Sequence, residues 1–172
     1  MNAGRRGIVL SEAGPLDARV IAELHLQCFA DGLGGAAWGA ASIAKILSLP
    51  GSYAYLAVVA PEKAAVRAAA ATPALAGFLL AHILAGESEI LSLGVATAWR
   101  RHGAARALLR AAMERAGRAG AARTLLEVAE GNMAARGLYA AEGFALVKRW
   151  PRYYRQPGGT AAAALVFARD LP

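Results

Sequence analysis

The chain has 172 residues, a length that suits one domain, and 57% of them are hydrophobic, enough to build a packed core. Lysine and arginine outnumber acidic residues by 19 to 12, which gives a formal net charge of +7 at pH 7 and favours an anionic ligand. Only three basic residues are lysines and the arginines are dispersed, so a nucleic-acid partner is not favoured. The one cysteine, Cys28, excludes an intrachain disulfide and a multi-cysteine metal site.

Neither of the two apolar segments in the first half of the chain has the features of a targeting or membrane-spanning signal. The run Ile-Val-Leu at 8–10 is too short for the apolar core of a signal peptide. The longest uncharged run, 68–86, contains Pro73, Gly77 and His82, which argue against a membrane-spanning helix. We therefore expect a cytoplasmic protein with no membrane partner and one domain over residues 1–172.

The first half of the chain alternates apolar runs with turn signals. Helical spacing of apolar residues predicts a helix from Pro15 to about Cys28, and Gly86 with Glu87 predicts a tight turn between two paired strands. Alanine-rich residues 61–73 predict a loop or hairpin tip. The other predicted elements are strands at 7–10, 52–60, 74–84 and 89–96 and a short helix near 39–48.

The second half has clearer boundaries. An apolar stripe predicts a helix from Gly103 to about Ala119, with Gly120 just beyond its end. Asn132 is a suitable N-cap for a helix that runs to Glu142 and ends at Gly143. The remaining elements are strands at 123–128, 144–150 and 163–171 and a loop at 152–159. Together the pattern predicts one layered α/β domain with four helices.

The junction between the strand at 89–96 and the following helix carries the first functional signal. The sequence Trp-Arg-Arg-His-Gly-Ala-Ala (99–105) places arginines and a glycine where a helix begins. The first turn of a helix has unpaired N–H groups and the positive end of the dipole, so it suits a phosphate. Neither G-x-G-x-x-G nor G-x-x-x-x-G-K-[ST] occurs there. Alone, this pattern is as often structural as functional.

Arg100-x-x-Gly103-x-Ala105 resembles the Q/R-x-x-G-x-G/A signature of the GNAT family, the Gcn5-related N-acetyltransferases. Residues 124–144 resemble the second half of that family, with Glu127, Asn132 and Tyr139 at the spacing of its RimI-type ribosomal-protein-alanine N-acetyltransferase branch. The Tyr-Tyr segment within 152–159 is similar to a late loop of the same branch. The resemblance covers about 89–159 by motif, and residues 1–88 only in pattern.

The resemblance implies a central, mixed, mostly antiparallel sheet of about six or seven strands and an acyltransferase that uses acetyl-CoA as co-substrate without a metal. It implies that the amides of the loop hold the pyrophosphate and that Trp38, Tyr153 and Tyr154 meet the acceptor. Gly94 suggests a β-bulge that admits the pantetheine arm, and Val95 N–H is a candidate to face the forming oxyanion. The residues expected to bind the cofactor are Leu93, Gly94, Val95, Arg100, Arg101, His102, Gly103, Ala104, Ala105, Arg106 and Asn132.

Acetyl transfer to an amine needs a base and an acid. Alternation in the strand 123–128 places Glu127 on the half-buried face, where its carboxylate can accept the proton of an amine, directly or through water. Tyr139 follows Asn132 by two helical turns, so both share one face, and its phenol can protonate a departing thiolate. The structural alternatives are a charge that protects a strand edge for Glu127 and a core tyrosine for Tyr139.

Three functions stay open from the sequence. The first is acetylation of a protein N-terminal α-amine, such as that of a ribosomal protein, by direct transfer in a ternary complex. The second is acetylation of a small amine or antibiotic, which the lack of acidic residues between the Tyr-Tyr segment and Asp170 favours somewhat. The third is a non-catalytic, basic RNA- or ribosome-binding module. His25 and His82 are interpreted as structural, and Cys28 as too far back on its helix to carry an acetyl group.

Overall fold

The computed structural model describes residues 7–29, 37–59, 73–155 and 161–172. In these residues seven strands form one sheet in the order β1-β2-β3-β4-β5-β7-β6, antiparallel except for the parallel pair β4–β5. The predicted α/β class is confirmed, with a mixed sheet and four α-helices in the described part of the chain. The strands are β1 (Ile8–Ala13), β2 (Ser52–Val59), β3 (Ala74–Leu84), β4 (Glu87–Val95), β5 (Arg123–Ala129), β6 (Ala145–Arg155) and β7 (Ala161–Asp170). The helices are α1 (Ala18–Cys28), α2 (Ala40–Leu47), α4 (Ala104–Arg118) and α5 (Met133–Ala141).

Several predicted boundaries differ from the structure; the first strand, predicted at 7–10, runs to Ala13. Residues Pro15–Asp17 form a short 3-10 turn before α1, because the Asp17 carboxylate accepts a hydrogen bond from the Gly14 amide at 2.9 Å and fixes a tighter start. The turn between β3 and β4 is Ala85–Gly86, with φ of 51° and 80°, so Glu87 already belongs to β4.

The predicted loop at 152–159 is wrong for its first four residues, which continue β6 to Arg155 in pairing with β7. Its last four residues and the predicted loop at 61–73, apart from Pro73, lie outside the described residues. The ladder between β6 and β7 shifts register between Trp150 and Tyr154, where Pro151 lies, and pairing resumes at Tyr154.

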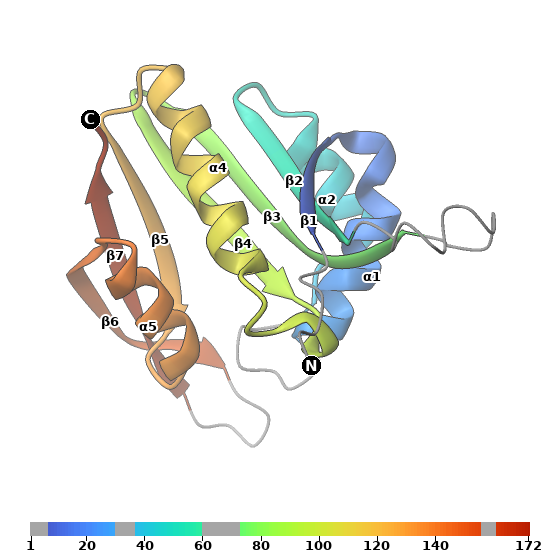
Figure 1. Cartoon of the computed structure of the whole chain (residues 1–172). Coiled ribbons are helices and arrows are strands. Elements are labelled where there is room, and N and C mark those ends of the chain that lie inside the picture. Colours follow the sequence, from blue (N-terminus) through green and yellow to red (C-terminus); the bar gives the residue numbers. More distant parts are fainter. Residues whose placement is uncertain (1–6, 30–36, 60–72, 156–160) are drawn as a thin grey trace, which may run out of the picture.

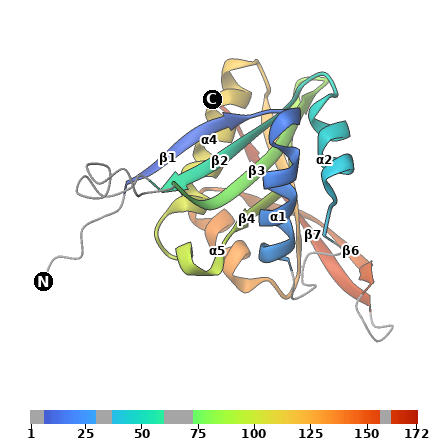
Figure 2. The same ribbon diagram turned by 90° about the vertical axis from the view of Figure 1, so that its right-hand side faces the viewer.

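The sheet separates two hydrophobic cores. Helices α1 and α2 cover one face, while α4 and α5 cover the other (Figures 1 and 2). The α1/α2 core includes Ile21, Ile43 and Phe78, and the α4/α5 core includes Leu108 and Leu126. Strand residues alternate between these cores, because successive side chains of a strand point to opposite faces. None of the described helices is long and apolar enough to cross a membrane.

The central feature of the sheet is a parting between β4 and β5. The two strands pair only from Glu87↔Arg123 to Ile90↔Leu126. Immediately beyond, β4 carries a bulge at Leu91, because Leu80 pairs with Ser92 while Ala81 pairs with Ile90. From that point the strands diverge (Figure 1). The middle of the sheet therefore opens between the two helical layers.

Helices α4 and α5 are joined by a buried carboxylate. The Glu142 side chain, 3% exposed, lies 2.8 Å from Arg106 Nε and 2.7 Å from Arg110 Nε. Arg110 donates a second hydrogen bond at 3.1 Å, and Arg169 donates to the carbonyl oxygen of Glu142. The hydrogen bond from Arg110 is the main cause that lowers the pKa of Glu142, and it outweighs burial, which raises it.

We expect Glu142→Gln to destabilise the protein at pH 7 and the difference from wild type to shrink in acid. The folded-state pKa of Glu142 lies below its ordinary value of 4.5, so the ionised side chain stabilises the fold above that value. This stabilisation is lost as pH falls through the lowered pKa. Melting temperatures of both proteins between pH 7 and pH 3 test this. Glu114→Gln, in an exposed pair with Arg118, is the control and should cost less than about 0.5 kcal/mol. A constant offset at every pH would contradict the assignment.

Candidate active site

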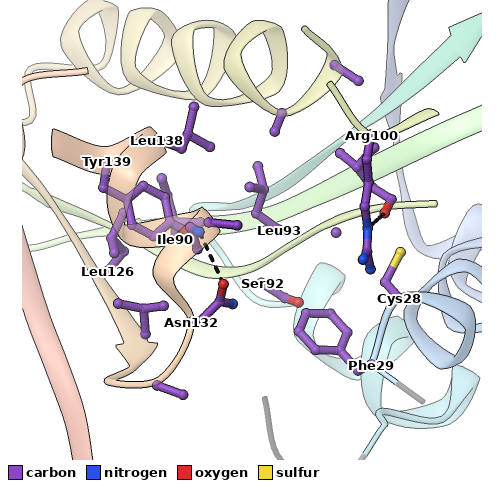
Figure 3. Close-up of a pocket in the computed structure, with 18 of the residues that line it drawn as sticks. Cys28, Phe29, Ile90, Ser92, Leu93, Arg100, Leu126, Asn132, Leu138 and Tyr139 are labelled. Carbon is purple, nitrogen blue, oxygen red and sulfur yellow. Dashed lines mark hydrogen bonds between the residues drawn. The ribbon is translucent and has the colours of Figure 1, made fainter. Parts of the chain in front are cut away.

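A cleft of about 690 Å³ runs through the parting of β4 and β5. Figure 3 shows Tyr139, Leu138 and Leu126 at one side, Leu93 at the centre, and Arg100 with Cys28 and Phe29 at the other. Its walls come from β4, β5, the loop before α4, the start of α5 and the end of α1. The cleft thus collects segments that lie far apart in the sequence around one opening in the sheet.

The loop before α4 is bent by two left-handed residues. Arg101 has a φ of 66° and Gly103 a φ of 89°, and Gly103 is the N-cap of α4. Within the described part of the chain, the amides from Arg101 to Arg106 donate to no backbone oxygen, and the first capping contact is Ala107 N–H to Gly103 O at 3.0 Å. These amides and the positive end of the helix dipole suit an anion, so residues Arg101–Arg106 are called the anion-binding turn below; that the turn holds a diphosphate stays a prediction.

The basic side chains of this loop have different surroundings. Arg100 and Arg101 line the cleft, whereas Arg106 lines it with its Nε already bound to Glu142. His102 is not among the lining residues; its exposed ring pairs with the carbonyl oxygen of Arg100 at 2.8 Å and so holds the turn. The His102 ring therefore supports the turn, and the expected contribution of the His102 backbone to cofactor binding stays a prediction.

The backbone of β4 presents hydrogen-bonding groups to the opening. Ala96 N–H donates to Ala76 O of β3 at 2.9 Å. Because N–H groups alternate in direction along an antiparallel strand, the amides of Leu93 and Val95 point away from β3 and toward β5. Arg100 Nε donates to Val95 O at 3.4 Å, which agrees with this direction. Leu93 and Val95 can therefore pair with an extended ligand that lies between the strands.

Gly94 has a packing role different from the predicted one. The bulge lies at Leu91, three residues earlier, and Gly94 pairs regularly with Phe78. A Cβ built on Gly94 would lie 2.6 Å from Phe78 Cε1 and 2.9 Å from Cys28 Cβ. Glycine is required there because α1 and Phe78 approach the backbone closely. The prediction that the strand bulges was right, and its position was wrong.

The predicted base and acid line the cleft from opposite faces of the sheet. Leu126 and Tyr139 belong to the α4/α5 core, where Tyr139 is 6% exposed and its ring packs on Phe144 and Phe167. Glu127 follows Leu126 on β5, so its half-buried side chain points to the α1/α2 face. Asn132 caps α5 as predicted, because its Oδ1 accepts a hydrogen bond from Ala135 N–H at 3.1 Å, and it also lines the cleft.

Three side chains at the end of α1, which the sequence analysis did not assign to the site, also line the cleft. His25, Cys28 and Phe29 lie at i, i+3 and i+4, a spacing that marks one helix face and was the available signal. Burial is the main cause that lowers the pKa of His25, and its Nδ1 accepts a hydrogen bond from the Trp38 amide at 3.3 Å. The neutral ring stacks on the Trp38 indole at 5.3 Å. His25 thus fixes Trp38, the predicted acceptor contact, on the wall of the cleft.

Cys28 corrects another expectation. It lies on the wall of the cleft rather than far from it. Burial raises the pKa of its thiol, and the nearby charge of Arg100 lowers it by less. A protonated thiol is a poor nucleophile, so burial, not distance, argues against Cys28 as an acetyl carrier.

Two predicted acceptor contacts lie beyond what the structure describes. The backbone of Tyr153 and Tyr154 belongs to β6, while their side chains lie outside the described residues. Among the described residues, no three His, Cys, Asp or Glu side chains come together as a set of metal ligands.

The acetyltransferase (GNAT) family model matches residues 50–144, more than half of the chain. The chain belongs to the GNAT family of acetyltransferases. The protein is therefore an acyltransferase with acetyl-CoA as its co-substrate. The sequence had predicted this membership from the segment that begins at Arg100.

Solved structures share the fold over nearly their whole length. The ribosomal-protein-S18-alanine N-acetyltransferase of Escherichia coli superposes with a TM-score of 0.78 at 19% identity, over 96% of this chain and 94% of that one. NAA60 of Arabidopsis thaliana in complex with acetyl-CoA gives 0.75 at 19%, over 95% and 98%. The ribosomal-protein-alanine N-acetyltransferase of Brucella melitensis gives 0.72 at 17%, over 95% and 99%. A search of curated protein sequences finds no significant match.

The residues present fit acetyl-CoA. The turn from Arg101 to Arg106 offers amides and positive charge to a diphosphate, and nothing lies within 4 Å of a Cβ built on Gly103. Leu93 and Val95 offer backbone groups to the amide-containing arm. Both places line the same cleft.

We expect Gly103→Ala to weaken acetyl-CoA binding. A φ of 89° disfavours any residue with a Cβ by about 1–2 kcal/mol, so the turn should shift and misplace its amides, although the added methyl group meets no neighbour. Isothermal titration with acetyl-CoA measures the effect. Gly117→Ala in α4 is the matched control, since it should stabilise the helix by about 0.5–1 kcal/mol and leave binding unchanged. Equal affinity of both variants would show that the turn does not bind the cofactor.

Proposed function

We propose that this acetyltransferase acetylates the N-terminal α-amine of a peptide or protein by direct transfer in a ternary complex. The observation that carries the proposal is the placement of Glu127 beside the opening, on the face of the sheet opposite Tyr139 and Leu126. A carboxylate on the α1/α2 side can meet an amine that enters from that side. The cofactor then occupies the α4/α5 side, where the anion-binding turn lies.

Two structural neighbours support the choice of a protein amine. The Escherichia coli and Brucella melitensis proteins act on an alanine of a ribosomal protein. Their low identity to this chain conveys the fold alone, so this support comes from shared architecture and not from matched acceptor residues. Membership of an acetyltransferase family favours an enzyme over a non-catalytic RNA-binding module.

The proposed roles follow from the chemistry of each group. When bound, acetyl-CoA supplies an acetyl group activated as a thioester. Glu127 accepts a proton from the acceptor ammonium, directly or through water; an α-amino group with an ordinary pKa of about 7.7–8.0 loses it at little cost near neutral pH. The Tyr139 hydroxyl donates a proton to the departing sulfur, and Val95 N–H stabilises negative charge that develops on the carbonyl oxygen.

Glu127→Gln should lower kcat by about 10²–10⁴-fold and leave acetyl-CoA affinity nearly unchanged, because it removes the proton acceptor but keeps the shape. Release of free thiol with an Ala-starting peptide measures turnover. Glu89→Gln is the control, since Glu89 lies in a partly exposed pair with His82 and does not line the cleft. Full activity of Glu127→Gln would rule out its role as base.

Tyr139→Phe should also reduce kcat and preserve cofactor binding, since only the hydroxyl is lost. Tyr53→Phe is the matched control, because Tyr53 is equally buried and its hydroxyl bonds Ala112 O at 3.1 Å, away from the cleft. If the two variants lose the same small amount of activity, Tyr139 is a core tyrosine and not the acid.

The acceptor class is tested with a panel of Ala- and Ser-starting peptides against polyamines and aminoglycosides. The proposal expects a higher kcat/KM for the peptides. Preference for the small amines would favour the second function that the sequence left open. Thermal stabilisation by acetyl-CoA with no turnover of any amine would count against both.

A further inference from the structure

We propose that Ser92 is a specificity-determining residue whose hydroxyl donates a hydrogen bond to the carbonyl group next to the reacting α-amine. This inference rests on the proposed function, because only an amino-acyl acceptor carries a carbonyl at that position. It concerns a side chain that neither the cofactor signature nor the acid–base pair involves.

Ser92 has the surroundings of a ligand-binding side chain. It is 8% exposed, it lines the cleft, and its hydroxyl has no hydrogen-bond partner among the described residues. Its Oγ is not one of the fully enclosed polar atoms that lack a partner, which in the described residues is Thr124 Oγ1, so the Ser92 hydroxyl is open to the cleft and free to bond a ligand or water there. In Figure 3 the hydroxyl of Ser92 points into the cleft near Phe29. Its partner therefore comes from whatever enters the cleft.

The face of the sheet on which Ser92 lies is the acceptor side. Ser92 pairs with Leu80, which belongs to the α1/α2 core, and directly opposed side chains share one face. Gly94, two residues on, faces Cys28 of α1. Glu127 points to the same face from β5. The hydroxyl and the carboxylate thus lie on one side of the opening, away from Tyr139.

The register brings Ser92 and Glu127 to the same level. The last paired residues of the two strands are Ile90 and Leu126. Glu127 is the first residue beyond that pair on β5, and Ser92 is the second on β4, after the bulge at Leu91. An amine at the Glu127 carboxylate would therefore have Ser92 across the opening. The carbonyl group two bonds from an α-amine is the polar group that lies within reach of it.

The walls near Ser92 are largely aromatic, and Arg100 lies on the same side of the cleft beside Cys28. Phe29 and Trp38 flank this half, with Trp38 held by His25. Among these side chains the Ser92 hydroxyl can donate to a carbonyl, while the Glu127 carboxylate is reserved for the amine. A hydroxyl on this wall discriminates between acceptors, because the analogue that lacks the carbonyl leaves it without that hydrogen bond.

The test compares two acceptors with wild-type protein and Ser92→Ala. One acceptor is an Ala-starting peptide, and the other is the same peptide with an (E)-alkene in place of the first amide, which keeps the shape and removes the carbonyl. We expect the wild type to prefer the peptide in kcat/KM by about tenfold and Ser92→Ala to lose that preference. The two acceptor amines differ in basicity, and this difference affects both proteins equally. It therefore cancels when the peptide-to-alkene ratio of kcat/KM for wild type is divided by the same ratio for Ser92→Ala.

Ser88→Ala is the matched control. Ser88 lies on the same strand, is fully buried, and its hydroxyl lies 3.4 Å from that of Tyr53, away from the cleft. It should lower the melting temperature without changing the preference, whereas Ser92→Thr, which keeps the hydroxyl, should retain it. An unchanged preference in Ser92→Ala would overturn the inference while leaving the proposed function intact. Absence of wild-type turnover of any peptide, with turnover of small amines, would instead refute the proposed function.

Discussion

The structure depends on the parting of two parallel strands in the middle of a sheet. β4 and β5 pair over four residues and then separate at the bulge of Leu91. Backbone N–H and C=O groups in the interior of a protein need hydrogen-bond partners. Where β4 and β5 separate, these groups of Leu93 and Val95 face the opening instead of a neighbouring strand, so a ligand can pair with them. A sheet that opens at its centre is accessible from both faces, so each pair of helices can contribute a different substrate-binding wall.

The arginines near the cleft fall into two groups: some are paired with Glu142, and others are available to a ligand. Arg106 lines the cleft, but Glu142 already holds its guanidinium and that of Arg110. The carboxylate thereby joins the helix that begins at the anion-binding turn to the end of the helix that carries Tyr139. The charge left for a diphosphate comes from Arg100, Arg101 and the amides of the first turn of α4. Fixed dipoles of this kind need no rearrangement when a ligand arrives.

The sequence predicted local features better than those created by long-range contacts. Gly103, Asn132 and Gly120 were placed correctly because a cap or a positive φ is determined within a few residues. Most residues expected to bind the cofactor lie in one continuous segment, 93–106, so a sequence motif could predict them. The acceptor half could not be predicted in this way, since His25, Cys28 and Ser92 meet only when α1 packs on β4. The position of the bulge was also misjudged, because glycine signals either a bulge or a close approach, and only the packing of Cys28 distinguishes the two.

The two halves of the cleft are built from different kinds of interaction. The α4/α5 half is held by a buried carboxylate paired with two exposed arginines, by a helix cap and by a left-handed glycine. The α1/α2 half is formed by side chains that pack against the sheet: Phe29, Trp38, Cys28 and a single hydroxyl at Ser92. Changes there alter the shape and polarity of one wall without disturbing the backbone that is proposed to bind the cofactor. Acceptor choice can therefore change by substitution on α1 and β4 while the acetyl-CoA half is preserved. This separation explains why the cofactor could be inferred from motifs, whereas the acceptor has to be argued from the geometry of Ser92 and Glu127.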